Sequence, residues 1–360
     1  MRILEVLPDL GRGGAEKLVC DLILRLKENN EVALLILYEE KDNSYYELLV
    51  KNGIKIYTVN KKNGLDFRAF FKVNKIIKKY KPNIIHSHRY VNLYLSLYYL
   101  LNKKQIGFHT VHNLAEKEQF GIHRKFTKWL FYHRKVKPIA ISNMVEDSIV
   151  KIYGIQKEKF YNIYNGIDLR RFYSDKSVSK TENFIAIGRL TKQKNYPLML
   201  ESFKKALQKY SHLTLTILGD GELHSEISNI IDELDLGKAV KLVGIVDDVE
   251  NYVFKSDCLL MSSNYEGFGL VIAECMAAGL PVVATKAGAI VELVEDNSNG
   301  LLSEVGDVDA FSNNIIRMVE MNRNNTFNMS EKSKELSKKF DIDKCAKLYE
   351  EIFNKSLNEK

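Results

Sequence analysis

Short apolar runs alternate with longer amphipathic runs along this chain, and the alternation limits the folds that the chain can adopt. The first apolar runs are typical of strands: "RILEVL", "EVALLILY", "IKIYTV", "PNIIHSH", "QIGFHTVH" and "PIAIS". Between them, "AEKLVCDLILRLKEN" and "FRAFFKVNKIIKKYK" show the apolar spacing of helices. Strands that alternate with helices predict a parallel sheet with helices on both faces.

The pattern restarts after about residue 175, with the strand-like runs "ENFIAIG", "HLTLTILG", "AVKLVG", "DCLLMSS", "LPVVAT" and "GLLSEV". Helical segments are expected near 195–209, 222–234, 268–279 and 307–321, and "YNGIDLRRFYSDKSVSKTEN" is typical of a polar linker. We therefore predict an α/β protein of two Rossmann-like, doubly wound domains that face a cleft. The predicted domains are 1–172 and 173–340, and 341–360 forms a helix that packs back on the body, toward the first domain.

Composition and charge narrow the possible functions. The 360 residues carry a net charge of +7, with 31 Lys and Arg against 18 Asp and Glu in residues 1–175, and 22 against 28 in the remainder. A basic first half and an acidic second half predict domains with different partners. No apolar run is long enough to span a bilayer, and the first residues lack the pattern of a signal peptide. The four cysteines are scattered, which favours free thiols and a cytoplasmic location.

Two loops at the ends of predicted strands are suited to phosphate. In "PDLGRGGAEK", Gly11, Gly13 and Gly14 precede a helix whose N-terminal N–H groups attract anions. This spacing matches neither the dinucleotide fingerprint nor the Walker loop, so a tight turn is an equally good interpretation. In "IAIGRLTKQKNY", Arg189 and Lys194 follow a strand, where two cations suit a diphosphate better than they suit a solvated loop.

The stretch "SNYEGFGLVIAECMAAG" contains Glu266 and Glu274, separated by seven mostly apolar residues. Glu266 directly precedes a predicted helix, whose dipole would stabilise the carboxylate, and Glu274 lies about two turns further on. An unpaired buried carboxylate is costly, so Glu274 needs hydrogen-bond donors. The vicinal hydroxyls of a ribose would supply them, and a second sugar would contact Glu266. The structural alternative is that Glu266 caps the helix and Glu274 pairs with a lysine.

This carboxylate pair, in its setting, resembles the signature of the family 4 glycosyltransferases, which have the GT-B fold and retain the anomeric configuration. Further segments resemble that family in the expected order: "GRGGAE" its N-terminal loop, "IIHSH" and "HTVHN" its mid-domain strand ends, "YNGID" its interdomain segment, and "GRLTKQKN" its Gly-Arg-Leu…Lys loop. Together they cover roughly residues 11–302 and are more specific for the family than for its substrate.

The resemblance implies a role for each matching residue. The implied donor-binding residues are Gly13, Gly14, Arg189, Lys194, Val246, Phe268, Gly269, Leu270 and Glu274; the implied catalytic residues are His112 and Glu266; the acceptor-side residues are Arg12 and His88. Arg189 and Lys194 would bind the diphosphate, and Glu274 the ribose. Glu266 and the backbone that follows it would bind the transferred sugar. Val246 would contact the nucleobase through its backbone, and His112 would lie near the donor sugar.

Two positions depart from the family pattern. Asn195 stands where the family often has glycine, and we expect Asn to accept the positive φ that glycine would adopt there. Ala287 replaces a second glycine that is common in the family, which leaves the contacts of that loop open.

His86, His88, His109 and His112 gather at two predicted strand ends. A metal site is conceivable from the residue type, but no carboxylate accompanies these histidines in the sequence, and the resemblance implies no metal. We therefore expect hydrogen-bonding roles and no metal, with His86 more structural than His88, and with one of His109 and His112 facing the cleft.

The predicted function is that of a hexosyl-type, retaining glycosyltransferase with a UDP-sugar as donor and no required cofactor. Basic aromatic segments at 67–82 and 123–137, the second with the more exposed aromatics, suggest a glycan or lipid-linked acceptor at the inner face of the cell membrane, in the synthesis of cell-envelope polysaccharide or glycolipid. Ordinary packed helices with solvated basic faces are the alternative interpretation of both segments. A UDP-sugar epimerase of the same fold, a noncatalytic sugar-nucleotide binder and a nucleic-acid binder remain competing functions, although a nucleic-acid partner would leave Glu266 and Glu274 unexplained.

Overall fold

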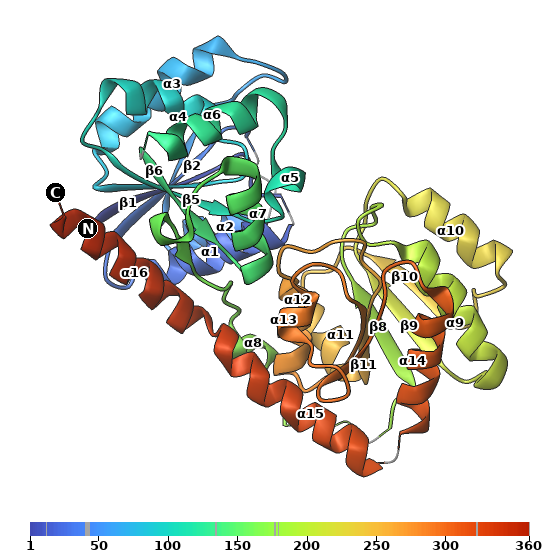
Figure 1. Cartoon of the computed structure of the whole chain (residues 1–360). Helices are drawn as coiled ribbons and strands as arrows, with labels where there is room; N and C mark the ends of the chain where they lie inside the picture. Colours follow the sequence, from blue (N-terminus) through green and yellow to red (C-terminus); the bar gives the residue numbers. More distant parts are fainter. Residues whose placement is uncertain are drawn as a thin grey trace. The chain divides into compact units, whose positions relative to one another are not determined.

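The structure is a computed structural model that describes residues 1–11, 13–39, 44–133, 135–175, 178, 180–321 and 323–359. The chain folds into two compact units (Figure 1). Unit 1 comprises Met1–Gly166 and Ile342–Lys360, and unit 2 comprises Ile167–Asp341. The chain therefore enters unit 1 twice, and the predicted domain limit at residue 172 lies six residues beyond the division at 166.

Unit 1 contains a seven-stranded sheet in which every strand pair is parallel. Its strands are β1 (Arg2–Leu7), β2 (Glu31–Ile36), β3 (Lys55–Thr58), β4 (Ile84–His88), β5 (Ile106–Val111), β6 (Val136–Ala140) and β7 (Tyr161–Asn162). Their order across the sheet is β3-β2-β1-β4-β5-β6-β7. The central strands are buried along almost their whole length, which explains their nearly continuous apolar sequences.

Helices cover both faces of this sheet. They are α1 (Gly14–Leu26), α2 (Ser44–Lys51), α3 (Phe67–Tyr80), α4 (Asn92–Leu101), α5 (Ala115–Glu118), α6 (Gly121–Tyr132), α7 (Asn143–Tyr153) and α16 (Ile342–Asn358), with a short 3₁₀ helix at Lys157–Lys159. In Figure 1, α3, α4 and α6 lie together over one face, and α1 and α16 lie together over the other. Local sequence sets the ends of these helices: the Ser142 hydroxyl accepts from the Val145 N–H, and Gly154 ends α7 with φ of 70°.

The α16 helix is part of the core of unit 1. The Phe353 ring lies 4.8 Å, centroid to centroid, from that of Phe108 in β5. The hydroxyls of Tyr349 and Thr110 are 3.0 Å apart. The last helix therefore packs on the sheet that residues 2–162 build.

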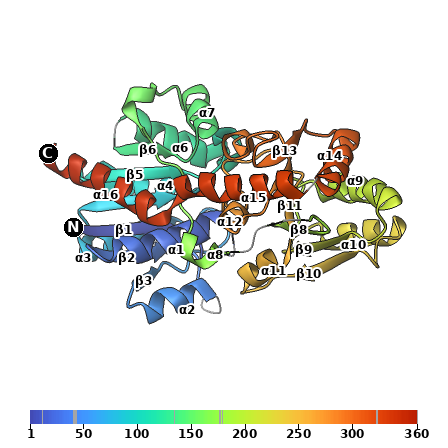
Figure 2. The same cartoon turned by 90° about the horizontal axis from the view of Figure 1, so that it is seen from below.

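Unit 2 contains a parallel sheet of six strands in the order β10-β9-β8-β11-β12-β13. Its strands are β8 (Asn183–Ile187), β9 (Thr214–Leu218), β10 (Val240–Gly244), β11 (Cys258–Met261), β12 (Val282–Thr285) and β13 (Gly300–Ser303). Its helices are α8 (Leu169–Phe172), α9 (Tyr196–Lys209), α10 (His224–Glu233), α11 (Val249–Lys255), α12 (Leu270–Ala277), α13 (Ile290–Leu293), α14 (Val308–Glu320) and α15 (Arg323–Ser337), followed by a 3₁₀ turn at Lys338–Phe340. Figure 2 shows α15 and α16 as successive helices at the end of the chain.

Each sheet has one point at which the strand order reverses. In unit 1 the chain builds outward from β1 to β3 and then restarts on the other side of β1 with β4. In unit 2 it builds outward from β8 to β10 and restarts beside β8 with β11. Loops diverge at such a point, so the carboxyl ends of β1 and β4, and of β8 and β11, are the places where each sheet can receive a ligand.

The predicted fold class is confirmed: both units are parallel-sheet, Rossmann-like domains, and all twelve expected strands are present. The elements that were not predicted are the two-residue strand β7, the helix α8 inside the expected linker, the polar helix α15, and the helices α2, α4, α5, α7, α11 and α13. All four cysteines are buried and free, as their scattered positions predict. Within the described part of the chain, no helix has both the length and the apolar character needed to cross a bilayer.

Gly219 provides a test of the close approach between the loops that follow β8 and β9. It has φ of +129°, and a Cβ atom there would collide with the carbonyl oxygen of Gly188 at the end of β8. We expect Gly219→Ala to lower the free energy of unfolding by roughly 1–3 kcal/mol, measured by urea denaturation. Gly237→Ala is the matched control, because that glycine has no neighbour within 4 Å of the added atom. Equal stability of the two variants would contradict the clash.

Candidate active site

The reversal point of unit 1 holds a buried polar cluster. Glu5 in β1 and His86 and His88 in β4 are at most 1% exposed. The Glu5 Oε2 atom lies 2.9 Å from His86 Nδ1 and 2.8 Å from His88 Nε2. His112, which directly follows β5, places its Nε2 2.8 Å from His88 Nδ1. The sequence resemblance implied His88 and His112, which contact each other directly, and the fold adds the Glu5 carboxylate, which the sequence did not indicate and which joins His88 to His86.

The rings of His86 and His109 also form hydrogen bonds with buried polar side chains of unit 1. His86 Nε2 lies 2.8 Å from the Thr110 hydroxyl. His109 is fully buried, and its ring nitrogens contact the Ser87 hydroxyl and the Gln119 amide. His109 therefore belongs to the core, whereas His112 is half-buried, and its Nδ1 is buried without a hydrogen-bond partner among the described residues.

Burial keeps these histidines neutral. It lowers the pKa of His86 and of His109 to about 3. It also lowers the pKa of His88 and His112 well below the usual range, and neighbouring imidazoles add to the effect. Burial raises the pKa of Glu5, although its hydrogen bond from His88 opposes the shift. A neutral imidazole carries one N–H, which it can donate to the carboxylate or to a neighbouring ring. With neutral rings, no buried positive charge has to be compensated.

The glycine loop after β1 is shaped by Glu16. This side chain, in the first turn of α1, is buried and forms an ion pair with Arg89, which follows β4 and has φ of +56°. A Cβ atom on Gly13 would collide with the Glu16 carboxylate. Gly13 has φ of −102°, so its backbone does not demand glycine, and a larger residue there would force the Glu16 carboxylate to move. Gly14 begins α1, and Arg12 lies outside the described residues.

A further carboxyl group lies beside His112. Glu118 in α5 accepts from the backbone N–H of Asn113 at 3.5 Å, and its Oε1 is buried with no hydrogen-bond partner among the described residues. Burial raises the pKa of Glu118 to about 8, so the group is largely protonated at neutral pH. The sequence "HTVHNLAEKE" gave no signal for this, because Glu118 lies among exposed-looking charges.

The reversal point of unit 2 holds the second half of the predicted site. Lys194, in the loop after β8, places its Nζ 2.6 Å from Glu266 Oε1, in the loop after β11. The Ser263 hydroxyl donates to the same oxygen at 2.7 Å. Glu266 is 6% exposed, and the Lys194 side chain is 18% exposed. The structure thus joins two residues that the sequence analysis assigned separately, one to phosphate and one to sugar.

Several hydrogen bonds hold these two loops in register. The Ser262 hydroxyl donates to the carbonyls of Lys194 and Asn195, at 2.8 and 2.9 Å. The Glu266 carbonyl accepts from the N–H of Ala289 at 3.1 Å. Gly288, with φ of +60°, is needed beside it, because a Cβ atom there would collide with that carbonyl. Loops after three neighbouring strands therefore fix the backbone of Glu266.

Glu274 lies in the middle of α12 and is 3% exposed. The helix begins after Gly269, which has φ of 95°, and no side chain caps it. The alternative in which Glu266 caps this helix is therefore not what the structure shows. Phe268 buries its ring against Phe340, with the centroids 5.3 Å apart, and Leu270 is half-buried at the first helical position.

Two more predicted residues lie at neighbouring strand ends. Arg189 lies two residues after the end of β8, its side chain is exposed, and no described residue forms an ion pair with it. Val246 follows β10, is half-buried, and comes after Gly244, which has φ of +86°. The expectation for Asn195 is confirmed, since it has φ of 48° at the start of α9. Ala287 is buried and has no positive φ, whereas the next residue is Gly288.

The cluster of unit 1 has the composition of a metal site. Glu5, His86 and His88 each offer one ligand atom, and these atoms lie within 4.8 Å of one another. The expectation of no metal rested partly on the lack of a carboxylate beside the histidines in the sequence. That reason is wrong, because β1 and β4 are neighbours and bring Glu5 beside them.

Exposed aromatic side chains of unit 1 are distributed differently from the expectation. In α6, Phe131 is buried and Tyr132 is 78% exposed, whereas in α3 Phe67 and Phe71 are 70% and 68% exposed. The segment 123–137 therefore holds the single most exposed aromatic ring of the two segments, but 67–82 holds two strongly exposed rings, so the expectation is met only in part. Phe120 at the start of α6 is also exposed. Both helices begin at the edge of the sheet where the strands end, which is the edge that holds the histidine cluster.

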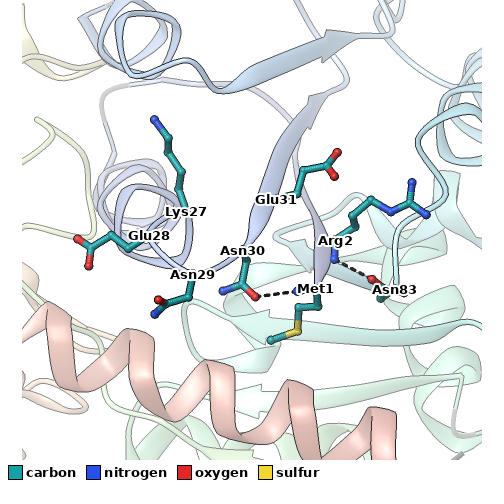
Figure 3. Close-up of a pocket in the computed structure, with 8 residues that line it drawn as sticks. All are labelled: Met1, Arg2, Lys27, Glu28, Asn29, Asn30, Glu31 and Asn83. Carbon is teal, nitrogen blue, oxygen red and sulfur yellow. Dashed lines mark hydrogen bonds between the residues drawn. The ribbon is translucent and has the colours of Figure 1, made fainter.

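The hollow drawn in Figure 3 lies at the opposite edge of the same sheet. Its volume is about 590 Å³, and its lining residues are Met1, Arg2, Lys27, Glu28, Asn29, Asn30, Glu31 and Asn83. Asn30 and Asn83 accept from the backbone nitrogens of Met1 and Arg2, at 3.2 and 2.7 Å. These bonds tie down the first strand at the amino ends of β1 and β2, away from every predicted site residue of the unit.

Comparison with known proteins gives one consistent result. Residues 12–171 match the family described as Glycosyltransferase Family 4, and residues 170–339 match Glycosyl transferases group 1. A Campylobacter jejuni relative, named as an N-acetylgalactosamine-N,N'-diacetylbacillosaminyl-diphospho-undecaprenol 4-alpha-N-acetylgalactosaminyltransferase, is 29% identical over 86% of this chain and 88% of its own length.

Two further proteins extend the comparison. An Escherichia coli UDP-Gal:alpha-D-GlcNAc-diphosphoundecaprenol alpha-1,3-galactosyltransferase is 27% identical over 71% of each chain. The crystal structure of HepE from Anabaena, solved with UDP and glucose, has a TM-score of 0.85 at 21% identity and covers 99% of this chain and 100% of its own. At that identity the structural likeness shows the shared fold.

The neutral histidines predict that acid destabilises unit 1. A folded-state pKa below the ordinary 6.5 means that the stability is present above pH 6.5 and is lost as the pH falls. We expect the free energy of unfolding to fall below pH 6.5 by about 1.4 kcal/mol per pH unit for each buried histidine. Urea denaturation followed by the fluorescence of Trp129, the one tryptophan and a residue of unit 1, measures this slope.

His109→Asn provides the control for this slope. It should reduce the pH slope of the free energy of unfolding by the contribution of one histidine, because His109 is buried and neutral but lies outside the Glu5 cluster. A constant free energy of unfolding between pH 7 and pH 5 would contradict the assignment of neutral histidines.

Proposed function

Since the chain belongs to the family 4 glycosyltransferases and has their GT-B fold, we propose that it transfers a sugar from a UDP-sugar to a lipid-linked glycan, with retention of the anomeric configuration. The observation that carries this proposal is the Lys194–Glu266 pair at the reversal point of the sheet in unit 2. It places a cation beside a carboxylate. The cation suits the negative diphosphate, and the carboxylate suits the hydroxyl groups of the sugar attached to it.

The diphosphate is bound by Arg189 and Lys194. Arg189 has no ion-pair partner among the described residues, so its guanidinium is available to two phosphate oxygens. Lys194 is held by Glu266, and Nζ has further protons to donate to a phosphate. The N–H groups at the start of α12 add a positive dipole end. These groups stabilise the charge that develops on departing UDP, and we propose that the reaction requires no metal.

The sugars of the donor are bound by the two carboxylates. Glu274, which is buried in α12, accepts from the vicinal hydroxyls of the ribose. Glu266 accepts from hydroxyls of the transferred sugar, with the backbone of Phe268, Gly269 and Leu270 alongside. Its carboxylate already accepts from Lys194 and Ser263, so it is oriented before the donor binds. The base contacts the backbone of the loop that contains Val246, and Gly13 and Gly14 also contribute to donor binding.

The bond changes are those of a same-face displacement. The bond between the anomeric carbon and the phosphate oxygen breaks, and the acceptor hydroxyl oxygen bonds to the same carbon from the same face. The hydroxyl proton passes to the departing phosphate oxygen of UDP. Glu266 binds the sugar and is not a covalent nucleophile, so the two-carboxylate mechanism of glycoside hydrolases does not apply. His112 contacts the donor sugar, and His88 contributes to the acceptor side; Arg12, the other implied acceptor-side residue, lies outside the described residues.

The names of the relatives support a lipid-linked acceptor. The Campylobacter jejuni and Escherichia coli relatives are both named for sugars on diphospho-undecaprenol, and the second is named for UDP-Gal. Exposed apolar side chains, which we call the edge patch, lie at the starts of α3 and α6. The edge patch consists of Leu65, Phe67, Phe71, Phe120 and Ile122. Exposed cations such as Arg68, Lys72 and Lys125 lie among them, which suits an anionic membrane surface.

Nucleotide binding is the first test of this function. We expect one UDP-sugar, with chelator present, to raise the melting temperature of the protein, because it binds only the folded state. Glu274→Ala should weaken its Kd about tenfold to hundredfold, since hydrogen bonds to a charged group are worth about 1.5–3 kcal/mol. Glu233→Ala, which removes an exposed carboxylate of α10, is the control and should bind normally. Failure of every nucleotide and UDP-sugar to bind would overturn the proposed donor site.

Membrane association is tested separately by vesicle flotation at low salt. We expect the protein to float with vesicles that contain phosphatidylglycerol and not with neutral ones. The double variant Phe67→Ser with Phe71→Ser should bind roughly tenfold or more weakly, because each exposed ring loses its apolar contact with lipid. Val291→Ser, at an exposed apolar position of unit 2, is the control. Equal flotation of both variants would show that the edge patch is not the membrane surface.

A further inference from the structure

A chain of hydrogen bonds runs from a buried carboxylate to the active-site histidine. It begins at Glu5 Oε2, continues to His88 Nε2 at 2.8 Å, and passes from His88 Nδ1 to His112 Nε2 at 2.8 Å. Its members come from β1, from β4 and from the residue that follows β5, three neighbouring strands of the sheet. The chain ends at His112 Nδ1, which is buried and has no partner among the described residues.

The carboxylate determines where each proton lies. An ionised carboxylate only accepts, so His88 must carry its proton on Nε2. In a neutral imidazole the other nitrogen then has a lone pair, so His88 Nδ1 accepts from His112 Nε2–H. His112 in turn keeps a lone pair on Nδ1. Burial, which lowers the pKa of both rings, supports their neutral form.

A second arm of the network agrees with this assignment. His86 Nδ1 lies 2.9 Å from the same carboxylate oxygen and therefore donates to it. His86 Nε2 then accepts from the Thr110 hydroxyl at 2.8 Å, and Thr110 accepts from the Tyr349 hydroxyl at 3.0 Å. In both arms the histidine next to Glu5 donates its N–H to the carboxylate, and each further group donates to the one before it. Every ring nitrogen of His86, His88 and His112 then has a hydrogen-bond partner among the described residues except His112 Nδ1.

We propose that Glu5 and His88 are positioning residues that hold His112 as the Nε2–H tautomer, so that its Nδ1 accepts a hydrogen bond from a hydroxyl of the bound sugar. This proposal rests on the proposed function, in which His112 contacts the donor sugar. The lone pair selects a hydroxyl at that position and repels a carboxylate, which favours neutral sugars over acidic ones as donors. Glu5 acts through two histidines and does not itself contact the substrate.

The same three residues would otherwise be read as metal ligands, and the experiment separates the two assignments. A metal held by Glu5, His86 and His88 would replace the protons on His86 Nδ1 and His88 Nε2 that these rings donate to Glu5. Elemental analysis of the purified protein is therefore the first measurement. A stoichiometric metal that is lost in Glu5→Leu would overturn the proposed tautomer chain.

The tautomers are measured directly by NMR of protein with ¹⁵N-labelled histidine, in which protonated and unprotonated ring nitrogens have separate shifts. For the native chain we expect His112 Nδ1 without a proton and His88 Nε2 with one. In Glu5→Leu the acceptor is gone, so His88 donates from Nδ1 and His112 becomes protonated on Nδ1. Ser87→Ala is the matched control, because it removes a buried hydrogen bond of β4 on the opposite face of the sheet and should leave both tautomers unchanged.

The kinetic arm uses the UDP-sugar that gives the largest thermal shift and follows release of UDP. We expect Glu5→Leu to lower kcat roughly tenfold or more, while the Kd for UDP alone stays unchanged, because unit 2 binds the nucleotide. If Glu5→Leu does not fold, Glu5→Gln replaces it, and His112 should then lose its fixed tautomer. His112 protonated on Nδ1 in the native chain, or an unchanged kcat in a folded Glu5 variant, would overturn the proposal.

Failure of the proposed function has a different signature. In that case the native chain binds no UDP and releases none from any UDP-sugar, whatever the histidine tautomers are. A native chain that binds UDP, with His112 Nδ1 unprotonated and a Glu5 variant that alters both tautomer and kcat, supports both proposals together.

Discussion

Parallel strands cannot be joined by tight turns, and this constraint determines where the polar residues of both units lie. Each crossover returns the chain to the start of a neighbouring strand, so the sheet grows outward until the chain restarts beside its first strand. At that restart the loops of two adjacent strands leave toward opposite faces. Unit 1 places Glu5 and His88 there, and unit 2 places Lys194 and Glu266 there. The strand order thus determines where the two polar sites lie, and the particular side chains determine what each site can bind.

The two sites solve the problem of buried charge in different ways. In unit 2, Glu266 is neutralised by Lys194, which also reaches partly into solvent, so the pair can exchange one partner for another group. In unit 1, Glu5 is surrounded by neutral rings and is separated from solvent, so its charge is spread over hydrogen bonds alone. The first arrangement suits a group that must meet a phosphate, and the second suits a fixed scaffold.

Local sequence was sufficient to predict every strand except β7 and about half of the α-helices, because apolar runs report burial within a few residues. It failed for β7, which has only two residues, and for α15, whose sequence "RNNTFNMSEKSKELS" is too polar to show a periodic face. Motifs located Lys194 and Glu266 but not their contact, which joins residues 72 positions apart. Glu5 was missed because a single glutamate in a strand resembles a solvent-facing residue until β4 is known to lie beside β1.

The position of α16 has a consequence for synthesis on the ribosome. Unit 2 is one continuous stretch, so it can fold as soon as it emerges. Unit 1 begins first but lacks the rings of Tyr349 and Phe353, which pack against His86 and Phe108, until the chain has passed through the whole of unit 2. The domain that is translated first is therefore completed last, and its open sheet face is a natural substrate for chaperones during that interval.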